Sequence, residues 1–377
     1  MKIYTRENLT GLVLDPTNPW EVQIKERIVP LIQAGCAQYI PNVNAQMGVV
    51  EIDDLKLPFS LNDDPRTSYV ANPLNYLEYG HDEIDIEISN RVANSSLHRF
   101  LNLLWIPFKR ANFHRVLILN NWLLSTNLYE LSLTPAQLEK LTAYFTTCYP
   151  DYVLMWRSLN AIHHSHLLPA YQKLGYAFVP SRQIYLLDPH KTAQRLPTNL
   201  KKDYRLLRRT KFQLLKDPPP RYAKAIAEVY RQLYNEKYSR HNPQYKTAYF
   251  AKILEGQAPN LRVFVDEEER VVAMRAFVNQ DGISVNPFLG YDRRRKGVPS
   301  LYRLITIQAF DETLAEGLLL HRSSGVASYK RSRGGRPTTE YSAVYWHHAS
   351  RRQKLAWQIF SAVLNKLALP FVQHYKL

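Results

Sequence analysis

A run of four cations followed by glycine, RRRKGVPS at 293–300, is the strongest chemical signal in this sequence. It lies between ISVNPFLGYD, which is typical of a strand, and LYRLITIQAF, which is typical of a helix. Unpaired N–H groups and the positive end of the helix dipole attract anions at a helix N-terminus, and glycine allows a ligand to approach the backbone. The pattern therefore predicts a phosphate-binding loop, with a solvated basic surface turn as the alternative.

A second segment, HRSSGVASYKRSRGGRPTTEY at 321–341, also combines glycines with lysine and arginine. Glu340 is the only acidic residue between Glu316 and the C-terminus. We expect Ser323-Ser324-Gly325 to end a strand at a ligand-binding cleft, where glycine turns the backbone around the ligand. A basic surface that contains turns is the competing interpretation.

The whole chain has a formal net charge of +16, and all the excess positive charge lies in its second half. Residues 1–187 contain 15 Lys and Arg against 17 Asp and Glu, whereas residues 188–377 contain 34 against 16. This asymmetry predicts an anionic partner for the second half: nucleic acid, an acidic membrane surface or a phosphorylated cofactor. A merely solvated basic face is the other interpretation.

The elements that must position these segments form two α/β halves. A length of 377 residues predicts two domains, which we place at 1–187 and 188–377. In the first half, hydrophobic periodicity predicts strands over 48–61 (a hairpin), 115–122, 151–159 and 182–188, and helices over 133–149 and 167–175. In the second half, it predicts three antiparallel strands within 261–292 and helices over 221–239, 299–317 and 354–369.

Cysteine usage and hydropathy limit the class of protein. The two cysteines, Cys36 and Cys148, match no metal-site spacing and cannot form a disulfide framework. No apolar run approaches the ~20 residues that span a bilayer. The start, MKIYTRENLTG, lacks the apolar region of a secretory signal. We therefore expect a cytoplasmic protein without a membrane span or a metal site.

The cation-rich loop is similar to a known family motif. Arg294 to Pro299 resemble the Q/R-x-x-G-x-G/A loop of the GNAT acyltransferase superfamily, which holds the pyrophosphate of coenzyme A. Pro299 replaces the final small residue and lacks an N–H donor. The resemblance implies acyl-coenzyme A (acyl-CoA) as the acyl donor. The cofactor-binding residues that it implies are Phe288, Leu289, Gly290, Arg293, Arg294, Arg295, Lys296, Gly297, Val298, Pro299 and Ser300.

The first half carries a second resemblance. NAIHHSHLLPAYQKLGY at 160–176 resembles the segment that follows the fifth GNAT strand, but no glycine occurs from 81 to 174, where a phosphate loop belongs. SSGVASYKRSRGG resembles a segment of the Fem-type peptidyltransferases and CelD-like acetyltransferases, which carry two GNAT modules. This resemblance implies an α/β (α+β) fold of two tandem GNAT-like domains, each with a mixed, mostly antiparallel sheet flanked by helices. Residues 1–187 would be degenerate, and residues 188–377 would bind acyl-CoA and be catalytic.

The family chemistry implies roles for particular residues. In GNAT enzymes an amine attacks the thioester carbonyl, a backbone N–H of a splayed strand polarises it, and an acid protonates the leaving thiolate. The resemblance makes 288–290 the backbone donors and Tyr329 the acid, with simple packing of the tyrosine as the alternative. Lys330 would hold a phosphate or a carboxylate. The basic surroundings of Glu340 suit binding of a substrate ammonium better than proton abstraction, and an ion pair with an arginine is equally compatible with the sequence.

An acceptor groove is expected from aromatic and polar residues. The candidate substrate-binding residues are Tyr234, Tyr238, Asn286, Ser324 and Arg333. Tyrosine offers an apolar body and a polar tip, although the same tyrosines would serve as a helix-packing face.

Two histidine groups are given a simpler interpretation. HHSH at 163–166 superficially resembles an HHxxxDG acyltransferase motif, but no Asp-Gly follows, so we expect surface histidines. His347 and His348 are likewise expected to be an exposed pair.

The sequence thus predicts an N-acyltransferase that moves an acyl group from acyl-CoA to an amine of a peptide or small-molecule acceptor. Lipidation of a peptide lysine or ornithine with a long-chain acyl group is one specific form. The alternative is a Fem-type enzyme that uses aminoacyl-tRNA, which would also account for the basic second half. A non-enzymatic nucleic-acid-binding protein is a third class, but no recognisable nucleic-acid-reading module accompanies the basic residues.

Overall fold

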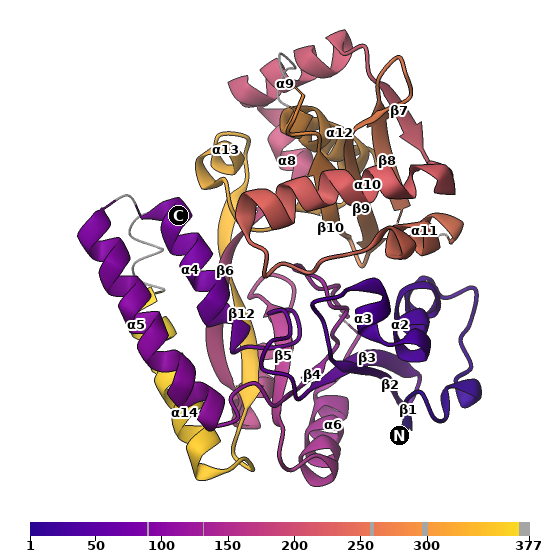
Figure 1. The fold of residues 1–377 in the computed structure, drawn as a ribbon. Helices are drawn as coiled ribbons and strands as arrows, with labels where there is room; N and C mark the ends of the chain where they lie inside the picture. The colour runs from indigo at the N-terminus through magenta and orange to yellow at the C-terminus, as the bar shows by residue number, and fades with distance from the viewer. Residues whose placement is uncertain (89, 131, 257–259, 296–300, 369–377) are drawn as a thin grey trace. The chain divides into compact units, whose positions relative to one another are not determined.

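The computed structural model describes residues 1–377 except 89, 131, 257–259, 296–300 and 369–377. The chain forms two compact units (Figure 1). Among the described residues, the first consists of 1–181, 235–245 and 341–368, and the second consists of 182–234 and 246–340. Strands β6 (Ala177–Leu187) and β12 (Arg336–Tyr345) cross the boundary and contribute to both units. The predicted division of the chain into two GNAT-like modules at 187/188 stays a prediction.

The first unit is built on strands in the order β1-β2-β3-β4-β5-β12. All these strands pair in antiparallel fashion except β4 and β5, which are parallel. The strands are β1 (Lys2–Tyr4), β2 (Gln46–Ile52), β3 (Leu55–Asn62), β4 (Val116–Leu119) and β5 (Val153–Leu159). The α-helices are α1 (Pro19–Gln23), α2 (Val29–Ala34), α3 (Cys36–Tyr39), α4 (Asn75–Glu87), α5 (Arg91–Arg110), α6 (Pro135–Cys148), α7 (Leu168–Lys173) and α14 (Arg351–Val363).

Local sequence accounts for several of these elements. Thr134 and Gln137 form a reciprocal capping box at the start of α6, and Pro135 occupies its first turn. The predicted hairpin over 48–61 is confirmed, since β2 and β3 pair from Gln46–Leu61 to Ile52–Leu55. The predicted strands at 115–122 and 151–159 and the helices at 133–149 and 167–175 are also present, with slightly shorter bounds.

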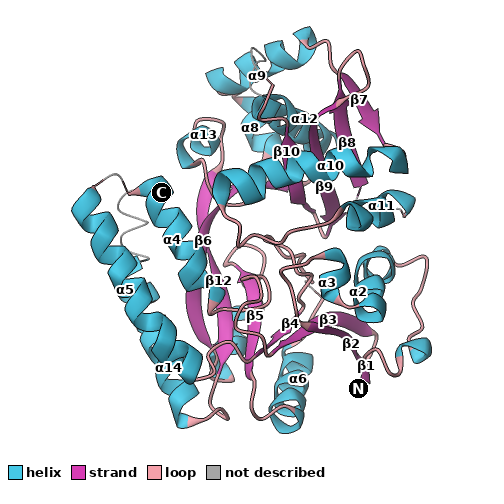
Figure 2. Ribbon diagram, in the orientation of Figure 1, coloured by secondary structure: helices cyan, strands magenta, loops and turns pink. Residues whose placement is uncertain are grey.

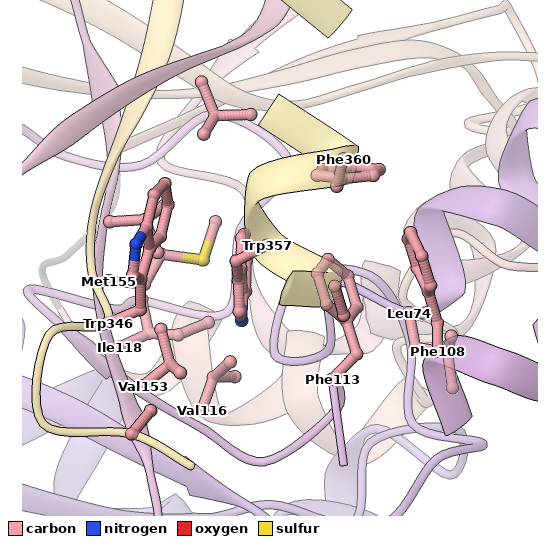
Figure 3. Close-up of a cluster of buried hydrophobic side chains, with 14 of the residues drawn as sticks. Leu74, Phe108, Phe113, Val116, Ile118, Val153, Met155, Trp346, Trp357 and Phe360 are labelled. Carbon is pink, nitrogen blue, oxygen red and sulfur yellow. The ribbon is translucent and has the colours of Figure 1, made fainter. Parts of the chain in front are cut away.

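Aromatic side chains fill the core of the first unit (Figure 3). Trp357 and Phe360 of α14 pack on Phe113, whose ring centroid lies 4.2 Å from that of Trp357. The aliphatic residues Val116 and Val153 come from the parallel pair β4–β5. The predicted closing helix at 354–369 is therefore a core element of the first unit, because its buried face supplies two of the largest side chains in this cluster.

The second unit contains strands in the order β6-β11-β10-β9-β8-β7 (Figure 2). Only β10 and β11 pair in parallel, and helix α12 connects them. The strands introduced here are β7 (Gln213–Lys216), β8 (Asn260–Val265), β9 (Val271–Gln280), β10 (Ile283–Tyr291) and β11 (Leu319–His321). The α-helices are α8 (Pro189–Gln194), α9 (Thr198–Arg209), α10 (Ala223–Arg231), α11 (Thr247–Glu255), α12 (Leu301–Ala315) and α13 (Ala327–Arg331).

The predicted fold class, a mixed and mostly antiparallel sheet flanked by helices, is confirmed in each unit. The three strands predicted within 261–292 are β8, β9 and β10. The predicted helix at 221–239 is wrong as a single α-helix, because it consists of a 3-10 turn, α10 and a π-helix over Gln232–Tyr238. The wider π turn follows directly on α10 at Gln232.

Trp357→Ala should destabilise the first unit by ~3–5 kcal/mol, because it removes a fully buried aromatic side chain and leaves a cavity. Ile359→Ala is the matched control on the same helix, since Ile359 is 40% exposed, and its effect should be within about 0.5 kcal/mol. Urea unfolding monitored by circular dichroism measures both variants. Equal midpoints for the two variants would contradict the assignment of α14 to this core.

Candidate functional site

The candidate site begins where two parallel strands of the second unit separate. β10 and β11 pair over Ile283–Leu319, Ser284–Leu320 and Val285–His321, and in the described residues their pairing ends there. The pairing of β10 with β9 shifts register between Val285 and Phe288. Such a bulge bends the strand and increases its local twist. The sheet is therefore opened on one side of β10 from residue 286 onward.

Asn286 spans this opening. Its side-chain amide donates to the carbonyl oxygen of His321 at 3.4 Å, and its Oδ1 accepts from Arg275 Nη1 at 2.9 Å. Arg275 is buried on β9 and also donates to Gln308 and Glu312 of α12. Burial lowers the pKa of Arg275 to about 10, and Glu312 opposes that shift. Asn286 thus links both diverging strands to a buried ion pair.

The predicted backbone donors lie on the bulged half of β10. Phe288, Leu289 and Gly290 pair with Ala276, Arg275 and Met274 of β9. A Cβ at Gly290 would lie 2.9 Å from the backbone of Val229 and Tyr230. Glycine is therefore required here because α10 packs directly against the strand. This packing role is independent of any role in ligand binding.

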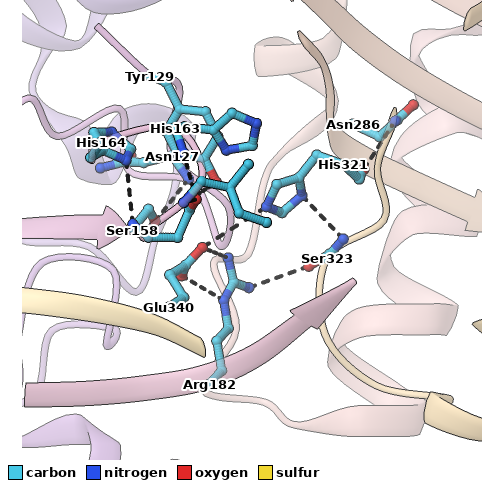
Figure 4. A network of polar contacts seen from close by, with 12 residues as sticks. Asn127, Tyr129, Ser158, His163, His164, Arg182, Asn286, His321, Ser323 and Glu340 are labelled. Carbon is cyan, nitrogen blue, oxygen red and sulfur yellow. Dashed lines mark hydrogen bonds and ion pairs between the residues drawn. The ribbon is translucent and has the colours of Figure 1, made fainter. Parts of the chain in front are cut away.

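A buried carboxylate lies beside the opening (Figure 4). Arg182 of β6 donates from Nε to Glu340 Oε1 at 2.8 Å and from Nη2 to Oε2 at 3.3 Å. Arg182 Nη1 also donates to the hydroxyl of Ser323 at 3.3 Å. Glu340 and its arginine therefore form the ion pair that was one of the two interpretations of this residue. Because both carboxylate oxygens accept from the guanidinium, the position of the carboxylate is fixed.

His321 faces the same carboxylate. Its Nδ1 accepts from the backbone N–H of Ser323 at 3.1 Å, and its Nε2 lies 4.0 Å from Glu340 Oε2. Since Nδ1 accepts, the proton of a neutral ring is on Nε2, directed to the carboxylate. Nδ1 is thus occupied by the Ser323 N–H, whereas the distance from Nε2 to Glu340 is longer than a hydrogen bond.

Lys330 is buried, and it holds the turn after β11. Its amine donates to the carbonyl oxygens of Ser323 at 3.1 Å and Ser324 at 2.6 Å. Ser323, Gly325 and Val326 all have positive φ, and a left-handed β-branched valine is strained. Burial, followed by Arg322 and Arg182, lowers the pKa of Lys330 well below its ordinary value. Lys330 thus lies on α13 and ties this helix to the turn at 323–324 through two carbonyl oxygens.

Tyr329 of α13 and Arg333 belong to a second cluster of polar side chains. The Tyr329 hydroxyl is 2.6 Å from Thr306 Oγ1, and the Arg333 guanidinium lies 3.6 Å from the ring centroid. Burial raises the pKa of Tyr329, opposed by Thr306 and two arginines. Arg333 also pairs with buried Asp203 of α9, so the candidate substrate-binding arginine is part of an interior ion pair.

The described arginines of the loop at 293–300, Arg293 to Arg295, each bind another group of the second unit. Arg293 donates to the backbone oxygen of Gln232 at 3.0 Å, Arg294 lies 3.2 Å from Glu228, and Arg295 lies 2.5 Å from Asp266. The guanidinium of Arg295 and neighbouring hydrogen bonds lower the pKa of Asp266, against the effect of burial. Lys296, Gly297, Val298, Pro299 and Ser300 lie outside the described residues. The phosphate-loop prediction therefore remains a prediction.

A groove of about 580 Å³ adjoins this run. Its lining includes Tyr222, Glu228, Gln232, Arg270, Asp292 and Arg294. Tyr234 lies in the same unit and stacks on Tyr230, with ring centroids 4.7 Å apart. Tyr238 belongs to the first unit, so the two predicted groove tyrosines are placed in different units. Tyr249 packs against Phe250 and Phe288, which supports the packing interpretation for that tyrosine.

The expectation of surface histidines at 163–166 is wrong for two residues. His163 and His164 are buried, and only His166 is exposed. The side chain of Asn160 accepts from the backbone N–H of His163 at 3.0 Å and so fixes the turn. His163 stacks on Tyr129, with ring centroids 5.2 Å apart (Figure 4). Burial lowers the pKa of His163 to about 4 and that of His164 to about 3, so both are neutral near pH 7.

Sequence patterns missed several residues of the second unit. Arg182, Asp203, Arg275 and His321 were not among the candidates, and each lies more than ten positions from at least one of its partners. The one available signal was the presence of ionisable residues within apolar strands, as in VVAMRAFV for Arg275 and LLLH for His321. In the described residues, no group of three or more His, Cys, Asp or Glu is arranged to hold a metal ion.

Comparison with solved structures identifies the fold. FemX superimposes with a TM-score of 0.51 and 7% sequence identity, over 84% of this chain and 90% of FemX. A tandem GNAT protein from the clavulanic acid biosynthesis pathway has a TM-score of 0.40 and 11% identity, over 89% and 91% of the two chains. L-PGS from Bacillus licheniformis has a TM-score of 0.44 and 14% identity, over 60% and 78%. No family model matches the sequence, and no curated protein matches it either. The likeness to FemX confirms the predicted tandem-GNAT, Fem-type resemblance at the level of the fold.

The buried lysine predicts a pH dependence of stability. The pKa of Lys330 is lower in the folded chain than in the unfolded one, so the unfolded state binds more protons between the two values. The free energy of unfolding should therefore rise with pH from the lowered pKa up to about 10.4, the ordinary lysine value. Lys330→Met should remove this rise, whereas Lys224→Met, at an exposed lysine of the same unit, should keep it.

Urea unfolding over a series of pH values from neutral upward measures this difference. An identical pH slope in wild type and Lys330→Met would show that Lys330 is protonated in the folded chain.

Proposed function

We propose that this chain, which has the fold of FemX, is an N-acyltransferase that moves an acyl group from acyl-CoA to an amine. The main structural support for this proposal is the separation of β10 and β11 after Val285 and His321. A strained turn follows at the end of β11. A parallel strand pair that opens in this way offers backbone groups of β10 to a ligand, which is the feature that the GNAT resemblance requires. The acceptor is proposed to be a peptide or small-molecule amine.

In the proposed reaction the amine nitrogen attacks the thioester carbonyl carbon, and the carbon–sulfur bond breaks. Backbone N–H groups of Phe288, Leu289 and Gly290 would stabilise the developing oxyanion. Tyr329 would donate its hydroxyl proton to the leaving thiolate, and its raised pKa keeps that proton in place near pH 7. The ammonium of the acceptor loses one proton to water before the attack, and the second proton that the nitrogen gives up as the amide forms restores the Tyr329 hydroxyl.

Glu340 is assigned to binding the acceptor. Its carboxylate is buried and is held by two hydrogen bonds from Arg182. A carboxylate held in this bidentate geometry suits binding of an ammonium group by charge attraction and hydrogen bonding. Lys330 is assigned a positioning role, since its amine binds the carbonyl oxygens of the turn at 323–324.

A second candidate function, transfer from aminoacyl-tRNA, is favoured by one observation. Helix α9 exposes a row of cations, and only Asp203 within the helix is acidic and is buried. The exposed cations are Lys201, Lys202, Arg205, Arg208 and Arg209. Such a surface suits a nucleic-acid backbone, and binding through it would weaken steeply with salt.

Ligand titration separates the two candidates. Coenzyme A and palmitoyl-coenzyme A should raise the melting temperature of the wild-type chain, since ligands that bind the folded state stabilise it. Asn286→Ala should abolish this shift, because the variant releases the link between the diverging strands. Asn279→Ala, on the neighbouring strand β9, is the matched control and should retain the shift.

Salt-sensitive stabilisation by bulk tRNA, lost in Arg205→Gln with Arg208→Gln, would instead support the second candidate. No response to either thioester ligand would contradict the first.

The role of Glu340 is tested by steady-state kinetics with an acyl-CoA and an amine acceptor. Glu340→Gln should raise KM for the amine about tenfold and leave kcat within about twofold, because it removes uniform binding of an ammonium. A fall in kcat of about a hundredfold or more, with KM unchanged, would assign proton abstraction to Glu340 instead.

A further inference from the structure

Helix α5 of the first unit has apolar residues on two opposite faces. Leu101, Leu104 and Trp105 are half-buried and Phe108 is buried, and all four pack in the core cluster of the unit. A second set faces solvent. It consists of Val92, Phe100, Leu103 and Ile106, which are 77%, 38%, 73% and 55% exposed. We call this second set the α5 stripe.

Helical geometry groups the stripe on one side. With 3.6 residues per turn, Val92, Leu103 and Ile106 lie within roughly 60° of one another around the helix axis, and Phe108 points to the opposite side. Figure 1 shows α5 beside α4 at the outer edge of its unit. The stripe is therefore an exposed apolar surface that the packing of α5 leaves uncovered, and such surfaces mark interaction sites.

The charged residues of α5 itself are all positive, whereas the neighbouring helix α4 carries Asp82, Glu83, Asp85 and Glu87. Residues 91–110 contain no Asp or Glu, and their cations Arg91, Arg99, Lys109 and Arg110 are exposed. Arg99 and Arg110 fall in the same sector of the helix as Leu103. The nearby carboxylate of Asp85 on α4 pairs with His98 and Asn94, which lie on a different flank of α5.

This charge pattern indicates what kind of partner would bind the α5 stripe. A second copy docked on the stripe about a twofold axis would bring the same cations together with no carboxylate on the helix to neutralise them. An anionic phospholipid surface is complementary in both respects, because its phosphates attract the cations and its acyl boundary accepts the apolar side chains. No described helix is long and apolar enough to cross a membrane, so such binding would be peripheral.

We propose that α5 docks on the surface of an anionic phospholipid bilayer. The α5 stripe enters the boundary between headgroups and acyl chains, while Arg99 and Arg110 contact lipid phosphates. The helix lies parallel to the membrane plane, with its Phe108 side still packed in the core. This proposal does not depend on the reaction that the second unit performs.

Vesicle co-sedimentation of the full chain tests the proposal. Vesicles of phosphatidylcholine mixed with phosphatidylglycerol should bind wild type more tightly than vesicles of phosphatidylcholine alone, and added salt should weaken the difference. Leu103→Asp with Ile106→Asp should lower the affinity about tenfold or more. The matched control is Leu355→Asp with Ile359→Asp on α14, two residues that are 58% and 40% exposed, and it should bind like wild type.

A second variant separates charge from apolar contact. Arg99→Gln with Arg110→Gln should remove most of the preference for phosphatidylglycerol and leave the weak binding to neutral vesicles unchanged. Circular dichroism confirms that each variant is folded; Leu103→Ser with Ile106→Ser replaces the aspartate pair if that pair unfolds the chain.

Two results would overturn the proposal. One is equal vesicle binding by wild type and the stripe variants. The other is a wild-type dimer, measured by light scattering, that the stripe variants dissociate and that shows no affinity for anionic vesicles. The second result would make the α5 stripe a self-association surface.

Discussion

The separation of β10 from β11 determines where several buried polar side chains of the second unit must lie. Two parallel strands satisfy each other's backbone groups, so a strand that leaves its neighbour inside a domain exposes N–H and C=O groups that need new partners. Asn286 donates to the carbonyl oxygen of His321, and Lys330 donates to those of Ser323 and Ser324. These side chains are polar and partly or fully buried because the backbone around the opening requires them. The geometry that keeps the opening in place is also what makes it available to a ligand.

Ion pairing determines which Lys and Arg side chains remain available to bind an anionic ligand or surface. Arg182, Arg275 and Arg333 each pair with a carboxylate in the interior of the second unit. Removing one partner of a buried ion pair is strongly destabilising, because it leaves the other charge buried without compensation. Arg294 and Arg295 are paired as well, although they belong to the run that suggested phosphate binding. The cations of α9 and α5, by contrast, are exposed to solvent.

Local sequence was sufficient for much of the fold. The helical spacing of apolar residues in 133–149 identified α6, and the strand pattern in 261–292 identified β8, β9 and β10. The resemblance of two short segments to GNAT motifs led to the fold class that the likeness to FemX confirms. These signals succeed because they are short-range: each involves residues within one or two elements.

Long-range features could not be predicted in the same way. Arg182 and Glu340 lie 158 positions apart, and no periodicity links them. The burial of His163 depends on its stacking with Tyr129, and the core position of Trp357 depends on strands from the first half of the chain. Helix α5 was not predicted from the sequence; Pro107 lies inside it, and proline usually ends or kinks a helix.

Hydrogen–deuterium exchange of the full chain, with and without coenzyme A, tests most directly whether the opened strand pair binds the thioester ligand. Backbone amides in 286–291 and 321–326 should exchange more slowly with the ligand present, because it would occupy the groups that the separated strands expose. Unchanged exchange in both segments at saturating coenzyme A would contradict the account, whatever changes occur elsewhere in the chain.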